Sequence, residues 1–221
     1  MRFPIRAHNA SLLVLATLTG CVVNAPPVAE RTPDGLVRIQ SKQADTVYAV
    51  PGVSLAPYKR VMLDSVDLAF KLDWQKRHPE ITESDITRIR SQGAAVFYEI
   101  FSSVLTKDNG YPLVTQPGPD VLRVTASVTE LDVAAAPTSN GMQQRMYVVS
   151  PSDLTMLMEL RDSTTGALLA RAIDRDKGRA VGNLQVADAV SNSAEARRAL
   201  ELWAGLLRGA LDRARNAAPI P

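Results

Sequence analysis

The chain has 221 residues, of which 46% are hydrophobic and 22% are charged, and it holds a single cysteine. This composition is that of a globular protein with one substantial core, and it excludes a chain that is disordered throughout. Once the first twenty residues are set aside, 23 basic side chains balance 23 acidic ones in the remaining 201 residues. Proteins that bind nucleic acid concentrate basic residues on one face, so this balance argues against nucleic acid as a partner.

The N-terminal residues have the order of a signal peptide for export. Arg2 and Arg6 come first, and an uncharged apolar run from Ala10 to Leu18 follows them. A helix that spans a membrane needs about 20 apolar residues, roughly twice the length of this run. We therefore expect residues 1–20 to be removed as a leader.

The leader ends at Leu18-Thr19-Gly20-Cys21, which resembles the lipobox of bacterial lipoproteins. The resemblance implies cleavage between Gly20 and Cys21, attachment of acyl chains such as palmitate to Cys21, and contact with the membrane through these chains. Because Val22 rather than aspartate follows, it also implies an outer-membrane location with the folded part facing the periplasm. The alternative is a soluble periplasmic protein with an unmodified cysteine. The rest of residues 21–35 includes three prolines and predicts an extended tether.

Residues 36–216 are predicted to form the folded domain, and residues 217–221 a C-terminal tail. Apolar and polar residues alternate over residues 58–70, which predicts a strand. The apolar positions change from odd to even residue numbers near Asp64, so a bulge or burial on both faces is expected there. Residues 71–80 predict a polar loop. Thr82-Glu-Ser-Asp85 is typical of a capping box, and the helix that it opens is predicted to end at a left-handed stop formed by Asn109-Gly110.

The second half of the domain is predicted to supply strands and another helix. We expect strands at residues 113–115 and 121–133, then a hairpin of residues 153–162 and 168–176. A second amphipathic helix opens at Asn192, and its Trp203 should dock, because burying a large apolar side chain contributes about 1.5–3 kcal/mol. This order of elements predicts an α+β fold, a single two-layer domain with an antiparallel or mixed sheet and two amphipathic helices packed on one face.

Five segments of this domain carry distinctive packing and turn residues: Tyr48–Pro51, Tyr58–Asp64, Asp120–Val124, Thr129–Asp132 and Glu159–Arg171. Together they resemble the DUF3313 family of Gram-negative lipoproteins, a family without an assigned function. The resemblance spans roughly Leu36 to Asn216. It implies a cell-envelope lipoprotein and indicates neither a ligand nor a partner.

The sequence offers few groups for catalysis. His78 is the only histidine beyond the leader, no Gly-x-Ser-x-Gly elbow is present, and no serine is followed three residues later by lysine. A nucleophile needs a base beside it, and His78 lies in a predicted polar loop before a proline. We therefore expect the protein not to be an enzyme.

Metal sites are also poorly supported. With one cysteine and one histidine beyond the leader, a zinc site would need mostly carboxylates. Asp174-Arg-Asp176 begins like a calcium loop, but Gly178 comes one place early and Gln185 stands where a carboxylate is needed. Copper could bind methionine, yet alternation places two of the candidates on the apolar face of a strand; the candidates are Met142, Met146, Met156 and Met158. We expect no metal and no cofactor.

Trp74 is the best candidate for contact with a partner, with Arg77 and His78 beside it, because exposed tryptophan is enriched at interfaces. Alternatively, Trp74 folds back onto the edge of the core. The sequence favours a non-enzymatic binding or accessory module for an envelope protein complex. Two alternatives stay open: a carrier of a small apolar molecule or lipid in a cavity between sheet and helices, and an enzyme built on carboxylates.

Overall fold

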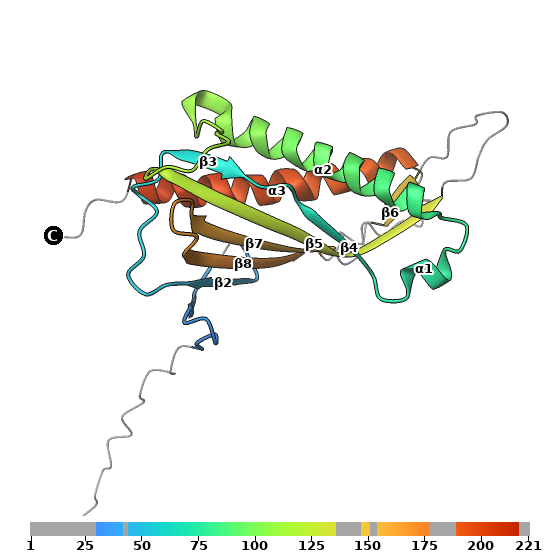
Figure 1. The fold of residues 1–221 in the computed structure, drawn as a ribbon, viewed down its shortest axis with the longest axis horizontal. Coiled ribbons are helices and arrows are strands. Elements are labelled where there is room, and N and C mark those ends of the chain that lie inside the picture. The colour runs from blue at the N-terminus through green and yellow to red at the C-terminus, as the bar shows by residue number, and fades with distance from the viewer. Residues whose placement is uncertain (1–29, 42–43, 136–146, 151–153, 177–188, 217–221) are drawn as a thin grey trace, which may run out of the picture.

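The computed structural model describes residues 30–41, 44–135, 147–150, 154–176 and 189–216. These residues form an α+β domain of two layers, with a mixed sheet on one side and two long helices on the other (Figure 1). The predicted fold class is confirmed. The leader, Gly20, Cys21, the calcium-like loop after Asp176 and the tail of residues 217–221 lie outside the described residues.

The longest strand of the sheet is β5 (Val121–Ala135). The strand order of the sheet is β1 (Val37–Ile39), β2 (Thr46–Ala49), β8 (Leu168–Asp176), β7 (Leu154–Asp162), β5 and β3 (Arg60–Leu63). β4 (Asp67–Phe70) and β6 (Tyr147–Ser150) also pair with β5. β5 runs parallel to β3 and β4 and antiparallel to β6 and β7, so the sheet is mixed. The predicted hairpin of β7 and β8 is confirmed.

The irregularity expected near Asp64 is present as a change of register between β3 and β4. Leu63 lies opposite Val124, whereas Asp67 lies opposite Ser127, so the strand carries one residue more than its partner over this stretch. A bulge of this kind reverses which side chains face the core. It explains how Val61 and Leu68, which have opposite parity, are both buried.

Helix α2 (Glu83–Thr106) begins with the predicted capping box. The amide of Asp85 donates to Thr82 Oγ1 over 3.3 Å, and the amide of Thr82 donates to Asp85 Oδ2 over 3.0 Å. The predicted stop needs correction, because the positive φ angles belong to Asp108 and Asn109 within η1 (Lys107–Asn109), and Gly110 has φ −69°. Glycine is needed at 110 for space, since a Cβ there would collide with the Leu105 carbonyl and the Arg208 guanidinium.

Helix α3 (Ala189–Asn216) begins three residues before the predicted start. Trp203 docks as predicted: its side chain is 2% exposed, and its indole N–H donates to Asp174 Oδ2 over 2.8 Å. α3 also packs against α2, and Arg208 donates to the carbonyls of Leu105 and Lys107 at the end of α2. The last carbonyls of a helix have no partner within it, so Arg208 acts as a C-terminal cap for its neighbour.

Several short elements were not predicted. No strand was expected where β1, β2 and β6 lie, and the loop at residues 71–80 contains a one-turn helix, α1 (Trp74–Arg77). Residues 113–115 contribute only an isolated bridge between Leu113 and Val61. Each missed strand is four residues or shorter, so alternation has too few positions to be recognised.

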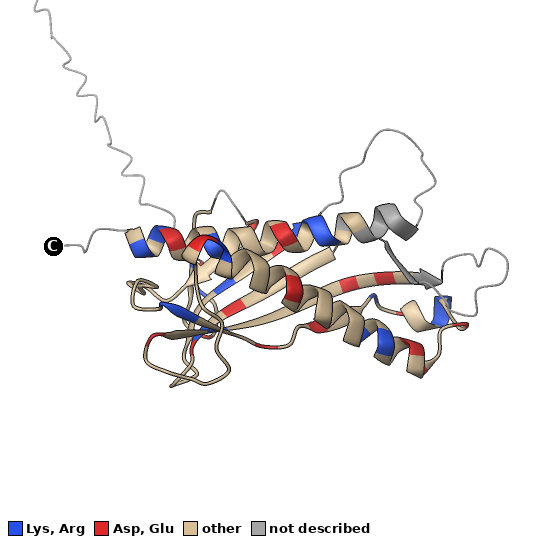
Figure 2. Cartoon of the chain, turned by 90° about the horizontal axis from the view of Figure 1, so that it is seen from above, with Lys and Arg blue, Asp and Glu red and all other residues tan. Residues whose placement is uncertain are grey.

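The outer surface of the helices carries charges of both signs, spread along α2 and α3 without a block of one sign (Figure 2). This distribution agrees with the balanced composition of the chain. Within the described ranges, no helix combines the length and the apolar character that crossing a membrane requires.

Candidate functional site: an apolar cleft beside α3

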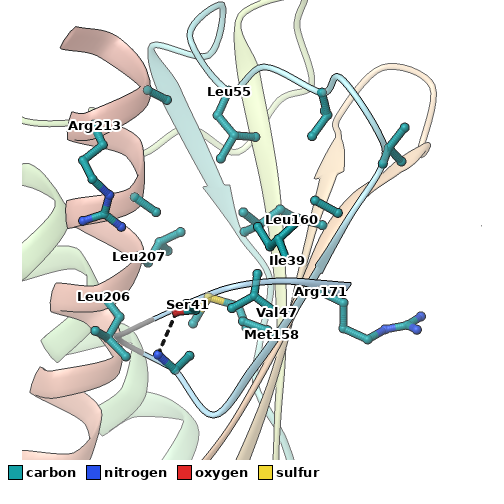
Figure 3. A pocket seen from close by; sticks show the side chains of 18 of the residues that line it. Ile39, Ser41, Val47, Leu55, Met158, Leu160, Arg171, Leu206, Leu207 and Arg213 are labelled. Atoms are coloured by element: carbon teal, nitrogen blue, oxygen red, sulfur yellow. Dashed lines mark hydrogen bonds between the residues drawn. The ribbon is translucent and has the colours of Figure 1, made fainter. Parts of the chain in front are cut away.

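A cleft of about 1270 Å³ lies between the C-terminal half of α3 and the strands β2, β7 and β8 (Figure 3). Residues 50–57, which connect β2 to β3, line a further side of it. The side chains that line it are mainly aliphatic; they include Val47, Leu55, Met158, Leu160, Leu206 and Leu207. The cleft is larger than the roughly 300–1,000 Å³ of a usual small-molecule pocket.

Small side chains line the cleft where the sheet meets α3. Ala49 of β2 lies directly opposite Ala170 of β8, and α3 contributes Ala210 and Ala214. An alanine ends at Cβ, so alanines on both the sheet and α3 leave volume that leucine or phenylalanine would fill. The sequence itself therefore determines this space.

The floor of the cleft is the inward face of β7. Met156, Met158 and Leu160 alternate along this strand and are at least nine-tenths buried. Methionine is unbranched and flexible, so a floor that contains two methionines can adapt to a bound apolar group. Trp203 lines the cleft and also belongs to the hydrophobic core.

The rim of the cleft exposes large apolar side chains. Ile39, on the edge strand β1, keeps 48% of its surface exposed, and Val50 keeps 37%. Both residues line the cleft. Contiguous exposed apolar surface is typical of an interaction site, whereas single exposed residues are ordinary.

Two of the three charged residues that line the cleft are paired within the domain. Arg171 donates to Glu159 and to Asp34, each over 2.7 Å, and the hydrogen bond with Glu159 raises the pKa of Arg171. Burial would raise the pKa of Glu159, but hydrogen bonds from Arg161 and Arg171 outweigh it and hold that pKa below its usual value. Asp174 accepts from Trp203 and from the amide of Asp45.

The third charged residue, Arg213, is exposed near the C-terminal end of α3. Among the described residues, no hydrogen bond or ion pair joins its guanidinium to another group. The neighbouring acid on the helix, Asp212, is already bound by Arg208 and by the hydroxyl of Tyr111. Arg213 is therefore a cation at an apolar cleft whose charge the described part of the domain does not neutralise.

The predicted contact surface in residues 71–80 needs correction for Trp74. Its ring is 2% exposed, stacks on Phe70 with 4.2 Å between ring centroids, and donates its indole N–H to the Val133 carbonyl over 2.8 Å. Trp74 thus belongs to the core, because both its apolar surface and its polar atom are satisfied there. The alternative, that Trp74 folds back onto the core, is therefore confirmed.

Arg77 and His78 do lie together, next to Trp74. Arg77 Nη1 is 3.4 Å from Asp132 Oδ2, and His78 Nε2 is 3.6 Å from Asp132 Oδ1. His78 Nδ1 also lies 3.2 Å from Glu80 Oε1. Within the part of the chain that the structure describes, no group of three or more histidine, cysteine, aspartate or glutamate side chains is placed to hold a metal ion.

Comparisons with known proteins identify a family and no activity. The model of a family described as "Protein of unknown function (DUF3313)" matches residues 32–207. None of the curated proteins compared matches the chain. Two structures of the PelC dodecamer from Paraburkholderia phytofirmans, one of them a point variant, are 14% identical, cover 74% of this chain and 96% of theirs, and have TM-scores of 0.38 and 0.37.

A third structure, a homolog of the neuraminyllactose-binding hemagglutinin from Helicobacter pylori, is 12% identical. It covers 80% of this chain and 92% of its own, and its TM-score is 0.36. The site must therefore be interpreted from its own residues.

Proposed function

The chain belongs to the DUF3313 family of proteins of unknown function, and we propose that it is a membrane-anchored lipoprotein that binds an apolar ligand in the cleft beside α3. The observation that carries this proposal is the cleft itself, which is large and aliphatic. Apolar surface gains roughly 25 cal/mol for each Å² removed from water, so a long apolar molecule seated there is stabilised along its length. The role is binding without catalysis.

The sequence supports the anchor. Leu18-Thr19-Gly20-Cys21 fits a lipobox, and Cys21 would carry the acyl chains at the outer membrane with the domain facing the periplasm. Glu30, the first described residue, follows Cys21 by nine positions, so the intervening chain can span at most about 30 Å. Arg31 then bridges to Val37 of β1, a strand that lines the cleft. A membrane anchor would thus hold the cleft close to membrane lipids.

The anchor is tested by mass spectrometry of the protein purified from envelopes. We expect a mature N-terminus at Cys21 with a mass increment for acyl chains, and release of a Cys21→Ser variant from the membrane fraction. An intact leader or an unmodified thiol would rule out the anchor. The ligand proposal is tested separately, because the cleft does not depend on acylation.

Carriage of a lipid or a small apolar molecule is the role that this cleft supports best. The accessory role for an envelope protein complex stays a prediction. The residue chosen to mediate that contact, Trp74, is buried, and Arg77 and His78 are engaged with Asp132.

Filling the cleft tests the ligand proposal. We would compare the mature chain carrying Cys21→Ser with a variant that adds Ala172→Leu and Ala210→Leu, two half-buried alanines that line the cleft from opposite sides. The matched control is Ala95→Leu on the exposed face of α2, which does not line the cleft. The assay is binding of the fluorescent apolar probe N-phenyl-1-naphthylamine, in the absence of detergent.

We expect the reference protein and the Ala95→Leu control to bind the probe, and the filled variant to bind at least about tenfold more weakly because leucine occupies the space. The filled variant should keep its melting temperature, since its new side chains enter open volume. Equal binding by all three proteins, or no binding by the reference protein, would refute the proposal.

A further inference from the structure

We propose that the ligand is a long-chain fatty acid, with its acyl chain in the cleft and its carboxylate on Arg213. This inference rests on the proposed binding function and adds the class of ligand. It starts from the charges at the cleft. Arg171 and Asp174 are held by partners within the domain, whereas the described residues provide no partner for the guanidinium of Arg213.

The position of Arg213 on α3 suits an amphiphile that lies along the helix. Leu206, Ala210 and Arg213 follow each other at four- and three-residue spacing, so they share one face of α3. In Figure 3, Arg213 lies farther along α3 than Leu206 and Leu207, and its side chain runs back along the helix, on the side away from Leu55 and Leu160. An acyl chain placed along this face would contact aliphatic side chains, and the exposed side chain of Arg213 would turn toward the cleft to meet its end group.

The chemistry of the end group follows from the charge. A guanidinium presents a planar fork of donors that matches a carboxylate in a bidentate pair, and such charge-assisted hydrogen bonds are among the stronger ones in proteins. One unpaired cation balances one negative charge. A single-chain acid with one carboxylate therefore fits both the aliphatic cleft and the charge at its end.

The alternative for Arg213 is a purely structural role at the end of α3, where a cation interacts favourably with the helix dipole. That role predicts no preference between ligands. Selectivity for the head group therefore separates the two roles, and the closing experiment measures it.

The experiment compares palmitate with 1-hexadecanol, which has the same chain length and a neutral head group, by displacement of the same fluorescent probe at a pH where the carboxylate is ionised. The proteins are the mature Cys21→Ser chain, Arg213→Gln and Arg198→Gln. Arg198 is a matched control, because it is exposed on α3, has no partner among the described residues and does not line the cleft. An Arg213→Lys variant tests whether charge alone restores selectivity.

We expect the reference protein and Arg198→Gln to bind palmitate about tenfold more tightly than hexadecanol, and Arg213→Gln to bind the two equally. Arg213→Lys should retain part of the preference, and added salt should reduce it. Equal affinity of the reference protein for both amphiphiles would overturn the assignment of Arg213 and leave the apolar cleft standing.

Two further outcomes have distinct meanings. If dipalmitoyl phosphatidylglycerol displaces the probe better than palmitate does, the ligand is not a single-chain acid and the inference is wrong. If none of the three amphiphiles binds the reference protein, the proposed function fails, and the inference fails with it.

Discussion

The two long helices cover the same face of one sheet, yet they meet it in two different ways. Beside α2, the core is filled by large side chains that are at most 1% exposed, and these are Phe97, Phe101, Leu105 and Tyr111. Beside the C-terminal half of α3, a cleft of about 1270 Å³ is lined in part by alanines of the sheet and the helix. One layered architecture thus provides both a packed core and a binding site, and the volume of the side chains decides which one forms.

The polar contacts also differ between the packed region beside α2 and the cleft beside α3. In the packed region they join helix to helix: Arg208 of α3 caps α2, and the Tyr111 hydroxyl donates to Asp212, with burial raising the pKa of Tyr111. Near the cleft, Arg171 joins Glu159 to Asp34, and one hydrogen bond, from the Trp203 indole to Asp174, joins α3 to the sheet. The contacts between the helices are therefore concentrated where the core is filled, and the cleft lies on the other side of α3's contact with the sheet.

The largest expected effect comes from truncating the packed region. Leu105 is completely buried, so Leu105→Ala removes its contacts and leaves an enclosed cavity. We expect the free energy of unfolding to fall by about 2–5 kcal/mol, measured by denaturant unfolding. A loss below about 1 kcal/mol would show that this region is not close-packed in solution.

A smaller effect is expected from removing the contact between the helices. Arg208→Met keeps much of the apolar stem but deprives the carbonyls of Val104, Leu105 and Lys107 of a charged donor. We expect a loss of about 2 kcal/mol in thermal or denaturant unfolding. Arg198→Met, an exposed arginine on the same helix, is the control and should change stability by less than about 0.5 kcal/mol. If both variants lose the same amount, the capping interpretation is wrong.

Acid should weaken the strands beside the cleft. Because hydrogen bonds from Arg161 and Arg171 hold the pKa of Glu159 below its usual value, Glu159 stabilises the fold above that usual value, and the contribution disappears as pH falls through the lowered pKa. We expect Glu159→Gln to lower stability by about 1 kcal/mol at neutral pH and to have little effect near pH 2–3.

The measurement is the melting temperature of the wild type and of Glu159→Gln between acid and neutral pH. Glu99→Gln, which breaks an exposed ion pair with Arg197, serves as the control and should have almost no effect at either end. If the difference between wild type and Glu159→Gln stays constant with pH, the carboxylate does not act through its charge.

Local signals in the sequence were sufficient for much of this fold. The capping box at Thr82 places two hydrogen bonds within four residues, and alternation over nine residues defines β7. The bulge near Asp64 followed from a change of parity within one strand. Each of these features is fixed by residues that are close in the chain, so pattern and capping chemistry reveal them.

The features that were missed depend on residues distant in the chain. Trp74 is buried because its indole reaches the carbonyl of Val133, 59 positions later. A cavity between sheet and helices was an open alternative, but its position was not predicted, because Ala49 and Ala170 meet only through the pairing of β2 with β8 and alternation within either strand gives no sign of that pairing. Alanines in β8 and in the last turns of α3 were the only sign of the cleft in the sequence. They form a site only because tertiary structure brings them together.

The smallest expected effect tests whether the cleft is open in solution. Leu206→Ala makes the same chemical change as Leu105→Ala, but Leu206 lines the cleft and is only partly buried. Because no enclosed cavity is left behind, we expect a loss of less than about 1 kcal/mol in denaturant unfolding. The comparison of the two leucines cancels the intrinsic difference between leucine and alanine in a helix. A loss as large as that of Leu105→Ala would mean that the sheet and α3 close over Leu206 in solution, which would leave an apolar ligand no place to bind.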